Sequence, residues 1–246
     1  MKKFELTTEF ITNMFGTKLF RIKALVEFGN IKAGELGGYV EKEENISQDG
    51  DAWVSDNATV CNNATVSGDA RISGNATVCN NAWVYGNAEV TGDATVSGDA
   101  WISGNARISD NATVCNNATV CNNATVSGDA RISGNAEVCN NAWISGNAEV
   151  TGNARISGNL CVAGNARISG NADYALVQGF GTEFRCTTFY RGKNKKIMVN
   201  CGCFHGDLEG FRKQVKETRN GKIAKEYLMI ADLMEYHFTS EDSSDE

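Results

Sequence analysis

The chain has 246 residues, 26 of them glycine and none proline, and 30 acidic against 23 basic residues give a formal charge of −7. This acidic balance argues against generic DNA binding, because phosphate binding needs a basic surface. No run approaches the ~20 apolar residues of a membrane helix, and the N-terminal residues contain no apolar signal-peptide core. We therefore expect a cytoplasmic protein without membrane association.

Residues 1–49 lack the pattern of the sequence that follows and are expected to form an N-terminal cap. The mixed apolar and basic run from Lys18 to Val26 alternates in part, which predicts a strand. Gly34, Gly37 and Gly38 predict turns before the repeat begins.

Residues from Gly50 to Ser169 form twenty six-residue units without an insertion. Each unit starts with Gly, Asn or Asp, followed by Asn or Asp, then Ala, a variable residue, Val or Ile, and usually a small residue. Alanine holds the third position of nineteen units, with Leu160 as the exception, and Val or Ile holds the fifth position of all twenty. A strict short period of this kind predicts a solenoid.

The chemistry of one unit predicts one side of a triangular coil. Side chains alternate along an extended segment, so Ala and Val/Ile share the inner face and the variable residue points outward. The Gly/Asn and Asn/Asp pair suits a corner because these residues tolerate positive φ. Three units give an 18-residue coil, and twenty units give six to seven coils.

The variable residues give independent support for three sides per coil. Stacking residues 18 apart places an arginine directly next to every glutamate of this series. It also places Trp83 next to Trp101 and lines up four threonines. Such pairs on neighbouring strands each contribute from a few tenths to ~1 kcal/mol.

This repeat resembles the left-handed parallel β-helix of the hexapeptide-repeat superfamily, over residues 50–169. The resemblance implies a mainly β fold: a left-handed, triangular parallel β-helix, assigned to residues 50–172. Homotrimers are common among such proteins, so a homo-oligomer, with a trimer favoured, is expected.

Residues 173–238 are predicted to form a small α+β domain docked on the last coil. Phe184 to Tyr190 and Ile197 to Cys201 read as two strands joined by the basic turn Arg191 to Lys196. Asp207 is predicted to be the N-cap of a first helix.

A second helix is predicted after Asn220-Gly221, which is a helix stop signal. The polar and acidic residues 239–246 are predicted to be a disordered tail.

The segments Ala33 to Glu41 and Cys201 to Phe211 resemble the flanks of uncharacterised phage and prophage repeat proteins, in which a solenoid lies between similar ends. This resemblance implies a viral accessory gene, acting in the cytoplasm of a bacterial host, and no particular activity.

Hexapeptide-repeat acyltransferases and carbonic anhydrases resemble only the solenoid. The acyltransferase family places a catalytic histidine on a coil or an inserted loop, whereas residues 50–169 contain neither a histidine nor an insertion. The carbonic anhydrases need three histidines for zinc, and this chain has only His205 and His237. We therefore expect no catalytic residue and no cofactor, with an acyltransferase using His205 as the enzymatic alternative.

Five of the nine cysteines hold the sixth position of a unit, each followed by Asn-Asn: Cys61, Cys79, Cys115, Cys121 and Cys139. Two pairs are one coil apart in the sequence and therefore stacked, but parallel side chains fit disulfide geometry poorly. A cytoplasm also keeps thiols reduced. We expect these cysteines to be small corner residues.

Cys186, Cys201, Cys203 and His205 can supply four zinc ligands if Cys186 faces Cys201 across the hairpin. The alternative, which we prefer, is that the alternate residues Cys201 and Cys203 belong to a core face and bind no metal.

Arg191, Lys193, Lys195 and Lys196 of the basic turn, with His205, are the candidate residues for binding a nucleotide or a host protein. Turn lysines are also often simply solvated. Trp53, Trp83, Trp101 and Trp143 are predicted to face outward, and exposed tryptophans mark interfaces. A contact between copies and a partner or ligand surface are both open.

These observations favour a non-enzymatic phage or prophage accessory binding protein. Its β-helix is a rigid oligomeric scaffold, and its C-terminal domain contacts a host protein or nucleotide signal, which inhibits a host defence system. The alternatives are an acyltransferase and a structural, virion-associated protein.

Overall fold

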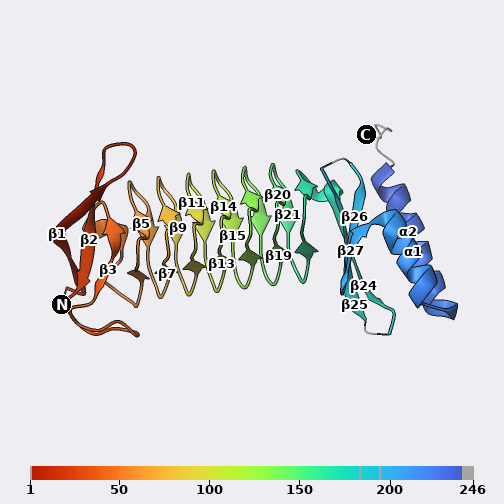
Figure 1. Cartoon of the computed structure of the whole chain (residues 1–246), viewed down its shortest axis with the longest axis horizontal. Coiled ribbons are helices and arrows are strands. Elements are labelled where there is room, and N and C mark those ends of the chain that lie inside the picture. Colours follow the sequence, from red (N-terminus) through yellow and green to blue (C-terminus); the bar gives the residue numbers. More distant parts are fainter. Residues whose placement is uncertain (1, 183, 194, 240–246) are drawn as a thin grey trace.

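The computed structural model describes residues 2–182, 184–193 and 195–239 of the chain. Figure 1 shows three parts in a row: an N-terminal antiparallel hairpin, a rod of stacked coils, and a C-terminal sheet covered by two helices. In the part of the chain that is described, no helix has the length and apolar character needed to cross a membrane.

The repeat forms strands of two residues each, which lie on three faces of the rod as parallel sheets. The first face contains β5 (Thr59–Val60), β8 (Thr77–Val78), β11 (Thr95–Val96), β14 (Thr113–Val114), β17 (Arg131–Ile132), β20 (Glu149–Val150) and β23 (Arg167–Ile168). The second contains β4 (Trp53–Val54), β7 (Arg71–Ile72), β10 (Glu89–Val90), β13 (Arg107–Ile108), β16 (Thr125–Val126), β19 (Trp143–Ile144) and β22 (Cys161–Val162). The third contains β6 (Thr65–Val66), β9 (Trp83–Val84), β12 (Trp101–Ile102), β15 (Thr119–Val120), β18 (Glu137–Val138) and β21 (Arg155–Ile156). The predicted three-sided, 18-residue coil is confirmed.

The interior of the rod is a narrow apolar column. Every third-position alanine, Leu160 at the one third position without alanine, and every fifth-position Val or Ile is no more than 1% exposed. Neighbouring coils are joined by backbone hydrogen bonds between residues 17 apart, such as Thr95 N–H to the Ala112 carbonyl at 2.9 Å. Burial and the parallel ladders together hold successive coils in one register.

The corners follow the predicted chemistry. The first residue of all twenty units has a positive φ, whether it is glycine, asparagine or aspartate. The second-position amides form ladders along the rod: Asn87 Nδ2 donates to Asn105 Oδ1 at 3.0 Å, and Asn105 Nδ2 donates to Asn123 Oδ1 at 2.9 Å. Corners of this kind therefore link one coil to the next through side chains as well as backbone.

The outward-facing residues pair as the 18-residue register predicts. Glu89 Oε2 lies 3.3 Å from Arg107 Nε, and the ring centroids of Trp83 and Trp101 are 5.7 Å apart. These contacts join neighbouring strands on the second and third faces.

The N-terminal segment extends the first face of the solenoid. β1 (Phe4–Thr12), β2 (Lys18–Ala24) and β3 (Leu36–Val40) are antiparallel neighbours, and β3 pairs in parallel with β5. A 3-10 turn, Glu43–Asn45, follows β3. Val40 pairs with Val60 and Ile46 with Val66, so the first coil is a 20-residue turn and is longer than the 18-residue coils after it.

Two of the predicted N-terminal turn residues lie instead inside a strand. Gly37 and Gly38 belong to β3, where a Cβ would lie 2.5 Å from the Val54 carbonyl oxygen and 2.6 Å from that of Ala58, respectively. They are small because the strand lies close to the coil below it. Gly34, at φ +86°, is a turn residue as predicted.

Trp53 is buried, so the prediction that it faces solvent is wrong. It is 3% exposed, and the rings of Phe4 and Phe28 pack edge-on against it, with centroids 6.4 and 5.4 Å away. The cap closes over the outer face of the first coil, which the repeat pattern alone does not reveal.

The C-terminal part is a four-stranded antiparallel sheet followed by two helices. Its strands are β24 (Tyr174–Phe180), β25 (Arg185–Arg191), β26 (Ile197–Cys201) and β27 (Phe204–Asp207), and its helices are α1 (Leu208–Thr218) and α2 (Gly221–Thr239). The predicted hairpin and both helices are confirmed, and the Asp207 side chain accepts a hydrogen bond from Gly210 N–H at 2.9 Å. The sequence did not indicate β24 and β27.

This sheet lies between the solenoid and the helices (Figure 1). Tyr190 joins the core of the rod, with Tyr174 and Met198 packed against it. On the other side, Phe189 and Val199 pack with the buried stripes of the helices. The sheet therefore closes the end of the apolar column. The predicted disordered tail lies outside the described residues from position 240 onward.

Candidate functional site

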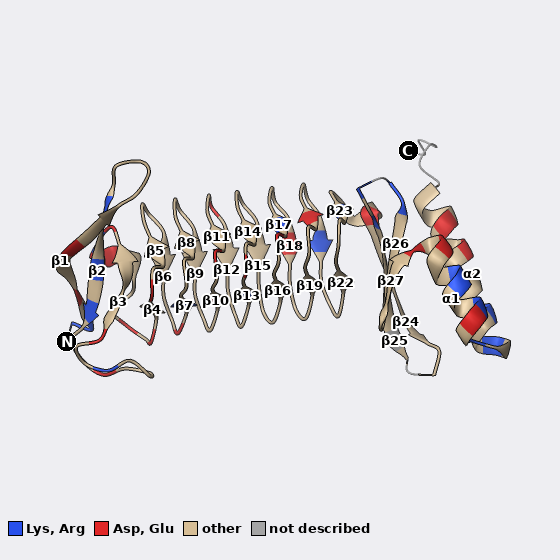
Figure 2. Ribbon diagram, in the orientation of Figure 1, with Lys and Arg blue, Asp and Glu red and all other residues tan. Residues whose placement is uncertain are grey.

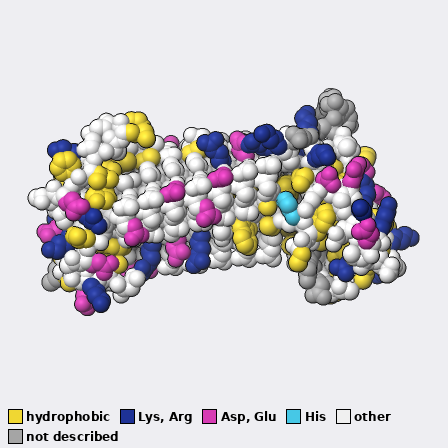
Figure 3. Space-filling view, in the orientation of Figure 1, with side chains coloured by type: hydrophobic (Ala, Val, Ile, Leu, Met, Phe, Trp, Pro, Cys, Tyr) yellow, Lys and Arg dark blue, Asp and Glu magenta, His cyan; other side chains and the backbone are white. Residues whose placement is uncertain are grey.

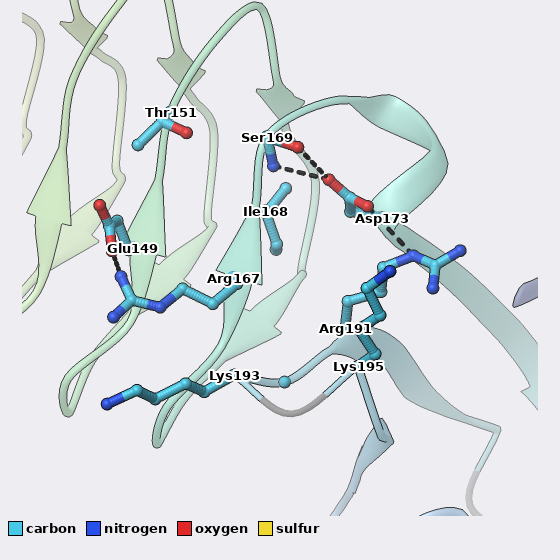
Figure 4. Close-up of a pocket in the computed structure, with 10 residues that line it drawn as sticks. Glu149, Thr151, Arg167, Ile168, Ser169, Asp173, Arg191, Lys193 and Lys195 are labelled. Atoms are coloured by element: carbon cyan, nitrogen blue, oxygen red, sulfur yellow. Dashed lines mark hydrogen bonds and ion pairs between the residues drawn. The ribbon is translucent and has the colours of Figure 1, made fainter.

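A cavity of about 330 Å³ lies where the last coils meet the C-terminal sheet (Figure 4). Its lining comes from the solenoid, the 3-10 turn Asn171–Asp173 and the connection between β25 and β26. The lining residues are Glu149, Thr151, Arg167, Ile168, Ser169, Asp173, Arg191, Gly192, Lys193 and Lys195. Three of the five predicted ligand-binding residues therefore lie together.

Asp173 joins the residues of one wall of the cavity through hydrogen bonds and an ion pair. Its Oδ2 accepts hydrogen bonds from Ser169 N–H and Oγ–H, both at 2.7 Å, and from Gly170 N–H at 3.1 Å. Its Oδ1 lies 3.2 Å from Arg191 Nε. Burial opposes ionisation, but the hydrogen bonds from Ser169 and Gly170 and the charge of Arg191 outweigh it, so the pKa of Asp173 is lowered.

The opposite wall comes from the solenoid itself. The Arg167 guanidinium forms an ion pair with Glu149 on the coil below, along the outward column of the first face (Figure 4). Glu149 is therefore neutralised by a residue of the same wall.

Lys193 and Lys195 enter the site from the β25–β26 connection. Lys193 N–H donates to the Asn165 carbonyl at 3.0 Å, and Ala166 and Gly192 form an antiparallel bridge, so the connection is docked on the last coil. Both side chains are exposed. Within the described residues, neither ammonium has a carboxylate partner among the ion pairs.

The cavity is locally cationic in an acidic protein. Four cationic side chains line it against the two carboxylates Glu149 and Asp173, and each carboxylate is already paired. Basic residues gather at this end of the rod in Figure 2 and along the upper edge of the junction in Figure 3. An anion, and above all a phosphate group, is the ligand that such a lining attracts.

Two other candidates lie outside this cavity. Lys196 Nζ lies 3.4 Å from Asp207 Oδ2, in a separate hollow beside α1 and α2. His205 lies on β27 and faces the last coil, with Nδ1 3.4 Å from Tyr190 Oη. Tyr190 donates its hydroxyl hydrogen to the Ala163 carbonyl at 3.1 Å, and burial raises its pKa to about 12.

The four candidate zinc ligands do not converge. Cys201 pairs with Thr187, so side-chain alternation places Cys186 on the opposite face of β25. Cys201 packs toward the helices, whereas His205 faces the solenoid. Cys203 is exposed in the turn between β26 and β27.

The tryptophans divide into separate groups. Trp83 and Trp101 are 52% and 45% exposed on the third face, where they line a hollow of about 290 Å³ with Asn81 and Asp99. Trp143 is exposed on the second face, away from this pair.

The corner cysteines correct one expectation. Cys121 and Cys139 form a disulfide, with Cα atoms 4.7 Å apart, although we expected stacked cysteines to stay unbonded. The coil spacing lies within the usual Cα range of disulfides, and the side chains can turn toward each other despite parallel Cα–Cβ directions. Cys61 and Cys79 are free, as expected, and a hydrogen bond from Cys61 lowers the pKa of Cys79 to about 7.

Comparison with known proteins supports the repeat. A protein-family model described as YdcK beta solenoid repeat matches residues 70–86, 100–116 and 106–122. This match agrees with the β-solenoid fold that the structure shows for the repeat. All three matches lie within the rod, and none includes a residue of the cavity. No curated protein matches the chain.

The sequence did not identify Arg167, Glu149 and Asp173 as cavity residues. The repeat did predict that Arg167 and Glu149 are stacked, because they are one 18-residue coil apart. The sequence did not reveal where the β25–β26 connection docks on the last coil, because tertiary contacts set that position.

Proposed function

We propose that this protein is a non-enzymatic binding protein whose junction cavity takes a phosphate-bearing ligand of nucleotide size. The observation that supports this most directly is the cationic lining of that cavity. Because Glu149 and Asp173 are already paired, Lys193 and Lys195 carry the positive charge that is left for a ligand.

The dimensions and chemistry of the cavity agree with this ligand class. Its volume of about 330 Å³ lies at the lower end of the range for small-molecule sites. Lysines act as mobile point charges on phosphate, whereas Arg167 and Arg191 are held in place by their carboxylates. The site therefore combines a fixed wall with two adaptable cations.

The solenoid is, in this proposal, the rigid scaffold of an oligomer. Trp83 and Trp101 expose a continuous aromatic surface, since their rings are in contact with each other and Trp101 also contacts Tyr85. Exposed aromatic clusters are enriched at interfaces between proteins. We expect a homotrimer that buries this face. Native mass spectrometry tests this, because the wild-type chain should be a trimer and the Trp101→Ser variant should form less of it.

The biological role proposed is that of a phage or prophage accessory protein in the cytoplasm of a bacterial host. Its flanks, Ala33 to Glu41 and Cys201 to Phe211, resemble those of phage and prophage repeat proteins. A protein that captures a nucleotide without turning it over would lower the concentration of a signal. We propose that it inhibits a nucleotide-signalling host defence in this way.

The binding test uses the full chain with cyclic and linear nucleotides and with inorganic phosphate in isothermal titration calorimetry. Lys193→Ala/Lys195→Ala should weaken binding at least tenfold, because a hydrogen bond to a charged group contributes about 1.5–3 kcal/mol. Lys216→Ala/Lys225→Ala removes the same charge from exposed helix positions and should leave binding unchanged. Equal effects of the two variants, or no binding at millimolar ligand, would refute the proposal.

The biological test measures phage plating on bacteria that carry a nucleotide-signalling defence. Expression of the wild-type chain should restore plating, and the Lys193→Ala/Lys195→Ala variant should not. Restoration by both would separate the phenotype from the cavity and favour a protein partner instead.

A host protein is the second candidate partner, and α2 provides the observation that favours it. Met229, Leu233 and Tyr236 are 60%, 58% and 72% exposed and lie on one stripe of the helix. Exposed apolar stripes at this spacing are typical of helices that dock in a groove. Loss of partner capture in Leu233→Ser, with nucleotide binding intact, would support this alternative.

A further inference from the structure

A second cluster of reactive side chains lies in the middle of the rod. The disulfide-bonded Cys121 and Cys139 hold equivalent corners of consecutive coils, and Cys139 is only 5% exposed. Glu137, two residues before Cys139, places its Oε1 3.3 Å from Cys139 Sγ. One ligand atom from each of the three residues lies within 4.8 Å of the other two.

The carboxylate of Glu137 is held in this position from its other side. Its Oε2 lies 3.6 Å from Arg155 Nε, on the next coil of the same face. One oxygen therefore faces the sulfur atoms while the other is engaged by a cation. This arrangement resembles the way in which outer partners orient carboxylates that bind metals.

We propose that Cys121, Cys139 and Glu137, once the disulfide is reduced, bind one thiophilic divalent cation such as Zn²⁺. Two thiolates and a carboxylate are ligands that zinc prefers, and sites with three protein ligands leave the fourth position to water. Zinc–sulfur bonds of about 2.3 Å place two thiolates about 3.8 Å apart in a tetrahedral site. Because the two Cα atoms are 4.7 Å apart, the coils need not separate to reach this spacing.

The cation and the disulfide exclude each other. Two molecules of a thiol reductant supply two electrons and two protons, which convert the disulfide to two thiols while the reductant becomes a disulfide. Cation binding then forms two metal–sulfur bonds and releases both thiol protons to solvent. The redox state of the surroundings thus selects between a covalent link and a metal link across the same two coils.

The other stacked pair provides a matched control within the chain. Cys61 and Cys79 also hold the sixth position of units one coil apart, and both are followed by asparagine at positive φ. The neighbouring Glu41 accepts the Asn62 N–H at 2.6 Å. Among the described residues, this pair forms no three-ligand group of the kind found at Glu137.

The test reduces the full chain with a phosphine, removes the phosphine without oxygen, and titrates the protein with Zn²⁺ against a chromophoric chelator. Cd²⁺ in a parallel titration reports thiolate ligation by ultraviolet absorption. We expect the reduced wild type to bind one cation that the oxidised wild type does not bind. The affinity for this cation should fall at least tenfold in each of Cys121→Ser, Cys139→Ser and Glu137→Gln. Even changes in residues that only contact a metal ligand cost 10–100-fold in affinity.

The Cys61→Ser/Cys79→Ser variant should bind this cation as the wild type does. Equal binding by reduced and oxidised wild type overturns the proposal, and this comparison needs no substitution that affects folding. Unchanged affinity in Cys121→Ser/Cys139→Ser, with native circular dichroism, also overturns it. A loss of cation binding in Cys61→Ser/Cys79→Ser alone also overturns the proposal, because it assigns the cation to the Cys61–Cys79 pair.

Discussion

The corner glycines make a quantitative prediction about how closely the coils are stacked. Gly128 has a φ of +68°, and a Cβ at this position would lie 2.9 Å from the backbone nitrogen and 3.0 Å from the carbonyl oxygen of Gly146 on the next coil. In Gly128→Ala the left-handed conformation alone costs about 1 kcal/mol. The steric contact with a well-packed neighbour adds about 1–3 kcal/mol. We expect a total loss of about 2–4 kcal/mol in the free energy of unfolding.

Gly158 separates these two contributions. It also has a positive φ, +83°, but a Cβ there has no neighbouring atom within 4 Å. Gly158→Ala should therefore lose only the conformational part, about 1 kcal/mol. Urea unfolding of both full-length variants, monitored by circular dichroism, measures the difference in their free energies of unfolding. The comparison requires that the dependence of this free energy on urea concentration is the same in both variants. Equal losses in the two variants would refute the argument that the corner backbone sets the spacing of the coils.

Three further predictions concern the cap, the cavity and the disulfide. Trp53→Ala should lose about 3–5 kcal/mol in urea unfolding because the ring is buried, whereas Trp83→Ala, half exposed, should lose much less. The lowered pKa of Asp173 stabilises the fold above its unfolded value of about 3.8 and ceases to do so as pH falls through the folded pKa. The difference in free energy of unfolding between wild type and Asp173→Asn should therefore be present at pH 7 and disappear at acidic pH. A difference that does not change with pH would contradict this. Reducing the Cys121–Cys139 disulfide, whose sequence separation is 18, should lower stability by about 3 kcal/mol, and Cys121→Ser should abolish the response to reductant.

The repeat was predictable because a single local rule acts in every unit. Alanine and Val/Ile alternate with an outward residue, and the corner residues accept positive φ. Once three sides per coil were inferred, the pairing of Trp83 with Trp101 and of Glu89 with Arg107 followed from arithmetic.

The two ends were less predictable because tertiary contacts decide them. The 20-residue first coil interrupts the 18-residue period, so β3 could not be recognised as a solenoid strand. The segment from Cys201 to His205 suggested metal ligands, whereas Cys201 ends β26, His205 belongs to β27, and only residues 202 and 203 form the turn between them. Of the candidate site, the cationic residues of the connection were found, but their position beside Asp173 depends on how the sheet docks.

The closed ends of the rod have a consequence for its length. The N-terminal segment covers the first coil and the C-terminal sheet covers the last, so neither end depends on how many coils lie between them. Insertion or loss of one whole coil shifts the two ends by about 4.8 Å, with every column of outward side chains still aligned. A change of one or two six-residue units instead rotates one end by one face or two. The length of the rod can therefore change in steps of one whole coil during evolution, while the fold of each end stays the same.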